Sequence, residues 1–311
     1  MTARPIIIDC DPGVDDAIAL LLALASADAL NLLGVTVVAG NVPLHLTEKN
    51  TRKICQLAGR SDVGIYAGCP RPLLQTLVTA EHVHGETGLK GANLPEPTLP
   101  LQPQHGVTFL IDTLTQTDEK VTLATLGPLT NVAVALIQQP QIVENIEEIV
   151  VMGGAITHGN VTPSAEFNIY VDPHAAQVVL GIGAKLTLIS LDVTHQALTT
   201  PERLTAIRAL ETQVSQAAAD MLAYYGAEDI ERYGLPGSPL HDPCVIAYLL
   251  QPTLFTNRPA YVEVDLASPL NLGRTVVDLW GSSGHPVNAK VLQSIDADGF
   301  YRLLIDRLAT L

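Results

Sequence analysis

Short apolar runs alternate with helix-like patterns through the first two thirds of the chain. The first run, at residues 6–8, is Ile-Ile-Ile without polar alternation, which is typical of a parallel strand buried on both faces. Similar runs predict further strands at 32–39, 63–67, 121–126, 148–152 and 186–191. Apolar spacing and turn residues predict helices over 17–25, 44–58, 107–115, 130–139 and 173–180. This β-α-β alternation predicts a parallel sheet flanked by helices.

The pattern changes in the last third of the chain. We expect one long helix at 201–225, a connection containing Gly and Pro at 226–240, and an apolar helix at 245–250. Shorter, partly alternating segments predict strands at 261–266, 275–279 and 288–295, before a final helix at 300–308. The prediction is an α/β fold: an open, mostly parallel, Rossmann-like sheet with a small antiparallel C-terminal extension. No linker or repeat interrupts residues 1–311, so we expect a single domain.

A long segment, residues 68–105, interrupts the regular pattern. Its six prolines disfavour regular structure, and it contains the sequence His82-Val-His84-Gly. A loop of this length inside a compact domain is usually either disordered or functional, and its clustered His and Glu residues favour function. His82 and His84 either line a binding pocket or form a solvated surface pair.

Composition narrows the class of partner. Hydrophobic residues make up 47% of the chain and aromatic residues only 4%, which indicates an aliphatic core. The formal net charge of -15 argues against a nucleic acid or an anionic membrane and favours a small ligand or a metal ion. Four cysteines without paired spacing, the lack of a signal-peptide pattern and the lack of a membrane-length apolar run favour a cytoplasmic location.

Five of the predicted strands end at residues that are candidates for a site. They are Asp9/Asp11, Gly40/Asn41, Leu126/Gly127, Met152/Gly153 and Asp192/His195. Because the carboxyl ends of parallel strands meet at one edge of the sheet, we expect these residues to lie together, where ligands bind in open α/β folds.

The first of these strand ends is unusually acidic, with Asp9, Asp11, Asp15 and Asp16 in eight residues. Two like charges about 4 Å apart repel by roughly 4 kcal/mol at an effective dielectric constant of about 20. No Lys or Arg lies between Arg4 and Lys49 to offset this repulsion locally. A hard divalent cation would compensate this repulsion. Alternatively, Asp15 and Asp16 cap the helix while Asp9 and Asp11 face water, although a cap needs only one carboxylate. Asp9 has either a structural role or one of orienting Asp11 or the metal.

Four motifs together resemble the inosine-uridine preferring nucleoside hydrolase family. They are D-x-D-P-G-x-D-D (9–16), M-G-G (152–154), E-F-N-I-Y-V-D-P (166–173) and H-D-P-C (241–244). The resemblance implies hydrolysis of the N-glycosidic bond of ribonucleosides with one bound Ca²⁺, for nucleoside salvage. The H-D-P-C form resembles the branch that accepts uridine, cytidine and inosine, or prefers pyrimidine ribonucleosides. The family resemblance also implies a homo-oligomer, either a tetramer or a dimer.

The resemblance also assigns roles to residues of this chain. The implied calcium ligands are Asp11, Asp16, Asp242 and the backbone carbonyl of Leu126, where some members have threonine. Asp11 would take a proton from the calcium-bound water, and His241 would lie beside the leaving base. The implied substrate-binding residues are Asp15, Asn41, His82, Met152, Asn160, Glu166 and Asn168. We add the hypothesis that Tyr224, Tyr225 and Tyr233 close over the nucleobase.

The chemistry of the predicted edge agrees with these roles. A site rich in carboxylates and poor in Lys and Arg stabilises the positive charge that develops on the sugar in an oxocarbenium-like transition state. An all-oxygen ligand set favours calcium or magnesium over zinc. Asn168 lies in an apolar run that we interpret as a buried strand, where its amide needs a partner.

Two other functions stay open at the level of sequence. Phosphatases of the haloacid dehalogenase type also begin with an apolar strand and D-x-D, but here Pro12 follows and the acidic edge would repel phosphate. A non-catalytic ribonucleoside-binding protein could use calcium as a sugar clamp. Release of free ribose from a nucleoside distinguishes an enzyme from a binder.

Overall fold

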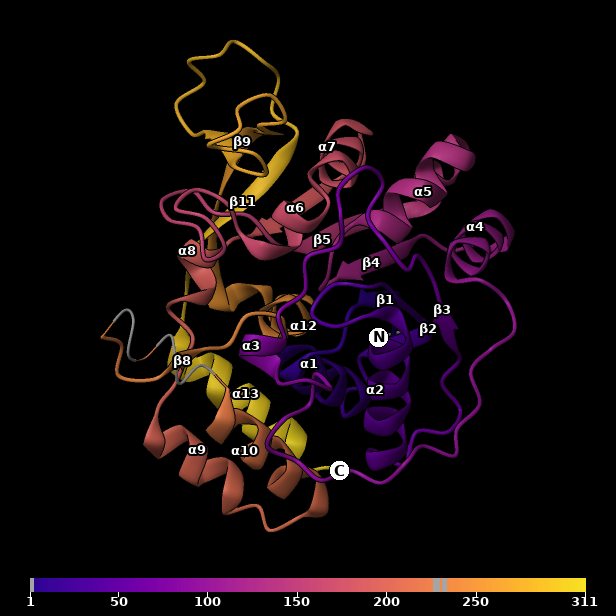
Figure 1. Ribbon diagram of the computed structural model, residues 1–311, viewed down its shortest axis with the longest axis vertical. Coiled ribbons are helices and arrows are strands. Elements are labelled where there is room, and N and C mark those ends of the chain that lie inside the picture. Colours follow the sequence, from indigo (N-terminus) through magenta and orange to yellow (C-terminus); the bar gives the residue numbers. More distant parts are fainter. Residues whose placement is uncertain (1–2, 226–229, 231–233) are drawn as a thin grey trace.

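The computed structural model describes residues 3–225, 230 and 234–311, and within them nine strands form one sheet (Figure 1). The order across the sheet is β10-β9-β11-β6-β5-β4-β1-β2-β3. The strands are β1 (Arg4–Cys10), β2 (Leu30–Val37), β3 (Ile65–Ala67), β4 (Val121–Thr125), β5 (Ile146–Met152), β6 (Leu186–Ile189), β9 (Phe255–Val264), β10 (Thr275–Asp278) and β11 (Ala289–Ile295). A separate two-stranded sheet pairs β7 (Leu198–Thr199) with β8 (Ser238–Pro239).

The sheet is parallel from β3 to β11 and antiparallel beyond it. Strand β11 pairs in parallel with β6 and antiparallel with β9, which in turn pairs antiparallel with β10. The predicted fold class is therefore confirmed, and the C-terminal extension is continuous with the main sheet. Helix α7 packs against β9, and in Figure 1 the orange and yellow loops beside β9 form the upper end of the molecule.

Helices cover both faces of the sheet. They are α1 (Val14–Leu24), α2 (Leu44–Leu57), α3 (Glu81–His84), α4 (Gly106–Gln116), α5 (Thr130–Gln138), α6 (Phe167–Val171), α7 (Pro173–Gly181), α8 (Leu191–Thr194), α9 (Pro201–Arg208), α10 (Gln213–Tyr224), α12 (Pro243–Leu250) and α13 (Ala297–Leu308), with 3-10 turns at Pro140–Asn145 and Pro252–Leu254. Ile6 and Ile8 pack with α1, α12 and α13, whereas Ile7 packs with α4, α5 and α7 on the opposite face. All three isoleucines are fully buried, as expected of a strand covered on both sides.

The predicted helix at 201–225 is wrong, because the structure contains two helices there. Helix α9 ends at Arg208, and α10 begins at Gln213. Between them Glu211 has a φ of 57°, a left-handed conformation that no α-helix continues. The Thr212 hydroxyl accepts a hydrogen bond from the Ser215 N–H, and the Ser215 hydroxyl accepts one from the Thr212 N–H. This capping box begins a new helix, which apolar spacing alone did not reveal.

Two other local predictions also need correction. The apolar run that contains Asn168 forms the short helix α6 instead of a strand, because the Glu166 carboxylate caps it by accepting the N–H groups of Asn168 and Ile169. Helix α1 has Gly13 at its N-cap, so neither Asp15 nor Asp16 occupies the cap position. Instead Asp16 lies in the first turn and accepts the Gly13 N–H at 3.0 Å. Within the described part of the chain, no helix is both long and apolar enough to span a bilayer.

Candidate active site

A cavity of about 620 Å³ opens at the carboxyl edge of the parallel strands. All of the predicted site residues line it except Asp11 and Asp16, which are fully buried. Segments from nearly the whole chain meet here, from Asp15 on α1 to Asp242 at the start of α12. Of the residues at the five predicted strand ends, Asn41, Leu126 and Met152 line the cavity, whereas Asp192 and His195 do not.

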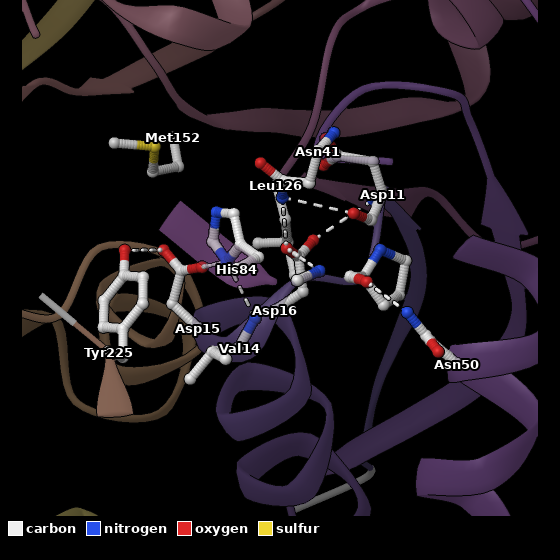
Figure 2. Close-up of polar contacts among 12 residues, drawn as sticks. Asp11, Val14, Asp15, Asp16, Asn41, Asn50, His84, Leu126, Met152 and Tyr225 are labelled. Atoms are coloured by element: carbon white, nitrogen blue, oxygen red, sulfur yellow. Dashed lines mark hydrogen bonds and ion pairs between the residues drawn. The ribbon is translucent and has the colours of Figure 1, made fainter. Parts of the chain in front are cut away.

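Asn41, which follows β2, joins two of the buried carboxylates (Figure 2). Its backbone N–H donates to Asp11 Oδ2 at 2.7 Å, and its Nδ2 donates to Asp16 Oδ2 at 3.0 Å. The backbone N–H of Asp11 also donates to Asp16 Oδ1 at 3.1 Å. These bonds fix both carboxylates, yet all of their donors are neutral and none balances the charge.

Three carboxylates have oxygen atoms within 4.8 Å of one another, and all three side chains are buried. They are Asp15, Asp16 and Asp242, so this trio contains Asp15 in place of the predicted Asp11. Burial, and then repulsion from Asp15, raise the pKa of Asp16 to about 7. Burial, and then the neighbouring carboxylates, also raise the pKa of Asp242 well above its usual range.

Asp11 lies beside this trio with one unsatisfied oxygen. Burial, and then repulsion from Asp16, raise its pKa well above the usual range, and its Oδ1 is buried without a hydrogen-bond partner. Glycines enclose the carboxylate: a Cβ on Gly40 would lie 2.0 Å from Oδ2, and one on Gly127 would lie 2.2 Å from Oδ1. Since a buried polar atom normally has a partner, this arrangement suits a cation that prefers oxygen ligands.

Leu126, which directly follows β4, lines the same cavity. Its carbonyl oxygen accepts a hydrogen bond from Asn168 Nδ2 at 2.7 Å, and the same nitrogen lies 3.2 Å from the carbonyl oxygen of Met152. Asn168 thus finds the partners that its burial requires and links the ends of β4 and β5 to α6. A carbonyl oxygen has a second lone pair, which leaves Leu126 able to bind a metal ion as well.

The polar wall of the cavity is fixed by its own hydrogen bonds. Glu166 Oε2 accepts the Gly154 N–H at 2.9 Å, and Asn160 Oδ1 accepts the Phe167 N–H at 3.0 Å. Burial raises the pKa of Glu166 to about 7, although the three N–H donors on its carboxylate oppose this shift. The wall therefore presents carboxylate and amide groups at defined positions, as binding of sugar hydroxyls requires.

Asp9 is buried close to the cavity and does not line it. Its Oδ1 accepts hydrogen bonds from the Thr36 hydroxyl and from Asn131 Nδ2, the latter at 2.8 Å. Asn131 also accepts the Cys69 N–H at 2.7 Å and so connects β1 with the loop after β3. The alternative in which Asp9 faces water is wrong, because this residue is 1% exposed.

His84 is a site residue to which the sequence assigned no definite role. Both His82 and His84 line the cavity, but only His84 is buried. Its Nδ1 accepts the Val14 N–H at 3.0 Å, and a Cβ on Gly13 would lie 2.4 Å from that nitrogen. Burial lowers the pKa of His84 to about 3, which agrees with a neutral ring that accepts a hydrogen bond. The alternative of a solvated pair is therefore wrong for His84.

His241 is held in a defined orientation at the start of α12. The Thr194 hydroxyl lies 2.7 Å from its Nδ1, and the ring of His195 is centred 5.7 Å away. Burial lowers the pKa of His241 to about 4, although the Asp15 carboxylate opposes this shift. A neutral ring at this position can hydrogen-bond a leaving group but needs a proton source to act as an acid.

The remainder of the cavity wall is apolar and aromatic. Phe167, Tyr224 and Tyr225 contribute to it, together with Val78 and Val83 of the long loop. Such a surface can contact a planar heterocycle through its faces. Tyr233, the third tyrosine of our hypothesis, lies outside the described residues.

Comparison with known proteins agrees with this geometry. Residues 6–302 match the family model described as inosine-uridine preferring nucleoside hydrolase. A pyrimidine-specific ribonucleoside hydrolase, RihA, from Shewanella woodyi is 46% identical over 308 residues, which cover 99% of this chain and 98% of the relative. An uncharacterized protein of Schizosaccharomyces pombe, C1683.06c, is also 46% identical over 308 residues. This match covers 98% of this chain and 99% of the relative. The solved structure of a purine-preferring ribonucleoside hydrolase from Gardnerella vaginalis superposes with a TM-score of 0.91 at 32% identity over 98% of both chains.

The fold and the site therefore define an α/β hydrolytic enzyme with an acidic ligand cavity. The chain belongs to the inosine-uridine preferring nucleoside hydrolase family and is a ribonucleoside hydrolase. This membership excludes both the phosphatase and the non-catalytic binder as its class.

Proposed function

We propose that this enzyme hydrolyses the N-glycosidic bond of ribonucleosides in a calcium-dependent reaction that yields ribose and the free base. Its main substrates are the pyrimidine ribonucleosides uridine and cytidine, and it acts on inosine to a lesser extent. The observation that carries the proposal is the group of buried carboxylates beside a polar wall, in a cavity where no Lys or Arg is found among the described lining residues. A pyrimidine preference is supported by the relative at 46% identity, which is named pyrimidine-specific, over the purine-preferring structure at 32%.

Asp11, Asp16, Asp242 and the carbonyl of Leu126 would hold the calcium ion. When bound, the ion supplies positive charge that acidifies a water molecule and orients the ribose diol. The orphaned Oδ1 of Asp11 supports this assignment, as does the mutual repulsion of the carboxylates. Charge balance is the physical reason: the cation lowers the energy of a buried cluster that otherwise must take up protons.

Asp11 is the proposed base that accepts a proton from the attacking water. Asp15, Asn160, Glu166 and Asn168 bind the ribose, with Asn41, His82 and Met152 completing the contact surface. As the bond to the base breaks, positive charge develops on the sugar, and the surrounding carboxylates stabilise it. His241, held by Thr194, lies beside the departing base and hydrogen-bonds to it.

A reducing-sugar assay with uridine, cytidine, inosine and adenosine tests the proposal. We expect free ribose from uridine and cytidine at the highest rates, loss of activity with a chelator, and recovery when Ca²⁺ is restored. Activity that survives exhaustive chelation would contradict the calcium assignment, and a faster reaction with adenosine would contradict the pyrimidine preference. The cytoplasmic location and the tetrameric or dimeric assembly implied by the family resemblance stay predictions.

A further inference from the structure

The segment between β5 and α6, residues 153–166, carries the polar wall of the cavity, and we call it the substrate loop. It contains Asn160 and Glu166 and leads directly to Asn168 on α6, all three of which line the cavity. The parallel sheet supports only the start of this loop. Backbone hydrogen bonds within the loop, and the Asp192 carboxylate on α8, which accepts the N–H groups of Ile156 and Thr157, set part of its conformation. Further contacts come from the C-terminal part of the chain.

The first two residues after Gly153 have all of their backbone polar groups paired. The Gly154 N–H donates to Glu166 Oε2 at 2.9 Å, and the Gly154 carbonyl accepts the Leu191 N–H at 3.0 Å. The Ala155 N–H donates to the Thr275 hydroxyl at 2.9 Å, and the same hydroxyl donates to the Ala155 carbonyl at 2.7 Å. One side chain thus satisfies both backbone groups of Ala155.

Thr275 reaches this position from β10, the outermost strand of the antiparallel extension. It is 2% exposed and is the buried residue of that strand, whose other three residues are partly or fully exposed. A Cβ on Gly154 would lie 2.7 Å from Thr275 Cγ2, and Gly154 has a φ of 79°. The absence of a side chain at Gly154 is what lets Thr275 approach so closely.

The turn before β10 makes a second contact with the same region. Gly273 has a φ of 81°, and a Cβ there would lie 2.9 Å from the Cα of Tyr170 on α6. The extension therefore touches both the start of the substrate loop and helix α6, which follows the loop.

We propose that Thr275 is a positioning residue for ribose binding, and that the antiparallel extension serves to clamp the substrate loop. The inference rests on the proposed function. Thr275 fixes Ala155, and the adjacent Gly154 N–H fixes the Glu166 carboxylate, which in turn caps α6 and sets the place of Asn168. Displacement of bound groups by as little as 1 Å can cost a large factor in rate, so this chain of contacts matters for activity.

Three variants test the clamp by steady-state kinetics with uridine and by inhibition with ribose. Thr275→Val keeps the shape of the side chain and removes its hydroxyl, whereas Thr275→Ser keeps the hydroxyl and removes the methyl group. Thr187→Val is the matched control. Thr187 is also fully buried, and its hydroxyl donates to Glu148 on β5, which does not line the cavity. We expect Thr275→Val to raise the KM for uridine and the inhibition constant of ribose about tenfold, with a smaller effect on kcat, because ribose contacts act in the ground state too. Thr275→Ser should stay within about twofold of the wild type.

Hydrogen exchange of residues 153–166 supplies a readout that does not depend on activity. The loop amides should exchange faster in Thr275→Val than in the wild type. In Thr187→Val their exchange rates should equal those of the wild type. Unchanged loop exchange overturns the clamp, and so does an equal rise in KM in the Thr187→Val control. Faster exchange with unaltered KM and ribose inhibition overturns the positioning role. If the wild type releases no ribose from any nucleoside, the proposed function fails, and the exchange measurement alone decides the clamp.

Discussion

The phenol hydroxyl of Tyr225 donates a hydrogen bond to Asp15 Oδ2 over 3.1 Å, although the two residues are 210 positions apart in the chain. Figure 2 shows this bond. The Tyr225 ring also stacks on His84, with ring centroids 5.4 Å apart. The end of α10 is thereby tied to the first turn of α1. Tyr225 thus helps to hold a carboxylate that we assign to ribose binding.

Tyr225→Phe should weaken substrate binding. The change removes a hydrogen bond to a carboxylate, worth about 1.5 kcal/mol, and we expect kcat/KM for uridine to fall about tenfold. Tyr261→Phe is the control, since that hydroxyl bonds to Glu263 on β9. Equal kinetic constants for Tyr225→Phe and the wild type would show that the bond to Asp15 has no part in activity.

Gly127→Ala should displace the proposed base. The new Cβ would meet Asp11 Oδ1 at 2.2 Å, a distance that no packing tolerates, so the carboxylate or β4 must move. We expect kcat to fall by about 100-fold or more. Gly181→Ala is a matched control, because a Cβ there meets nothing within 4 Å. Full activity in Gly127→Ala would mean that the position of Asp11 is unimportant.

His84 makes folding sensitive to acid. Its pKa is about 3 in the folded state and about 6.5 in the unfolded chain, so the unfolded state binds more protons between these values. The free energy of unfolding therefore falls as the pH drops from 6.5 towards 3, by up to about 4 kcal/mol from this residue.

His84→Gln removes this titration and keeps an acceptor for the Val14 N–H. Urea unfolding between pH 7 and pH 4 should show a shallower loss of stability in His84→Gln than in the wild type. His45→Gln, which changes an exposed histidine on α2, should follow the wild-type curve. Parallel curves for all three proteins would refute a buried neutral His84.

The fold was largely predictable because its strands are apolar on both faces. The βα alternation predicted that the strands are parallel, although it gave no strand order. Periodicity located every strand of the parallel part of the sheet. It failed at 201–225, where the apolar spacing continues across a break that depends on the Thr212 and Ser215 side chains. It also failed at 166–173, where a Glu166 cap turns an apolar run into a helix.

The strand ends predicted that Asn41, Leu126 and Met152 meet at one edge, and these residues line the cavity. The other site residues, namely Asn160, Glu166, Asn168, His241 and Asp242, were expected only from the family resemblance. What the sequence could not reveal are contacts that depend on tertiary packing. Nothing in the pattern of 68–105 distinguishes buried His84 from its neighbour His82, since burial comes from the approach of α1. Thr275 was equally hidden, because its role depends on the turn that brings β10 to Ala155.

Binding of Ca²⁺ to protein that has been depleted of calcium with a chelator tests the central claim most directly. Isothermal titration should give one ion per chain for the wild type, and Asp16→Asn and Asp242→Asn should each abolish or greatly weaken binding. Glu148→Gln, a buried carboxylate that hydrogen-bonds to Thr187 and is absent from the cavity lining, should bind like the wild type. Lack of calcium binding by the folded wild type, or unchanged binding by Asp16→Asn and Asp242→Asn, would contradict the account.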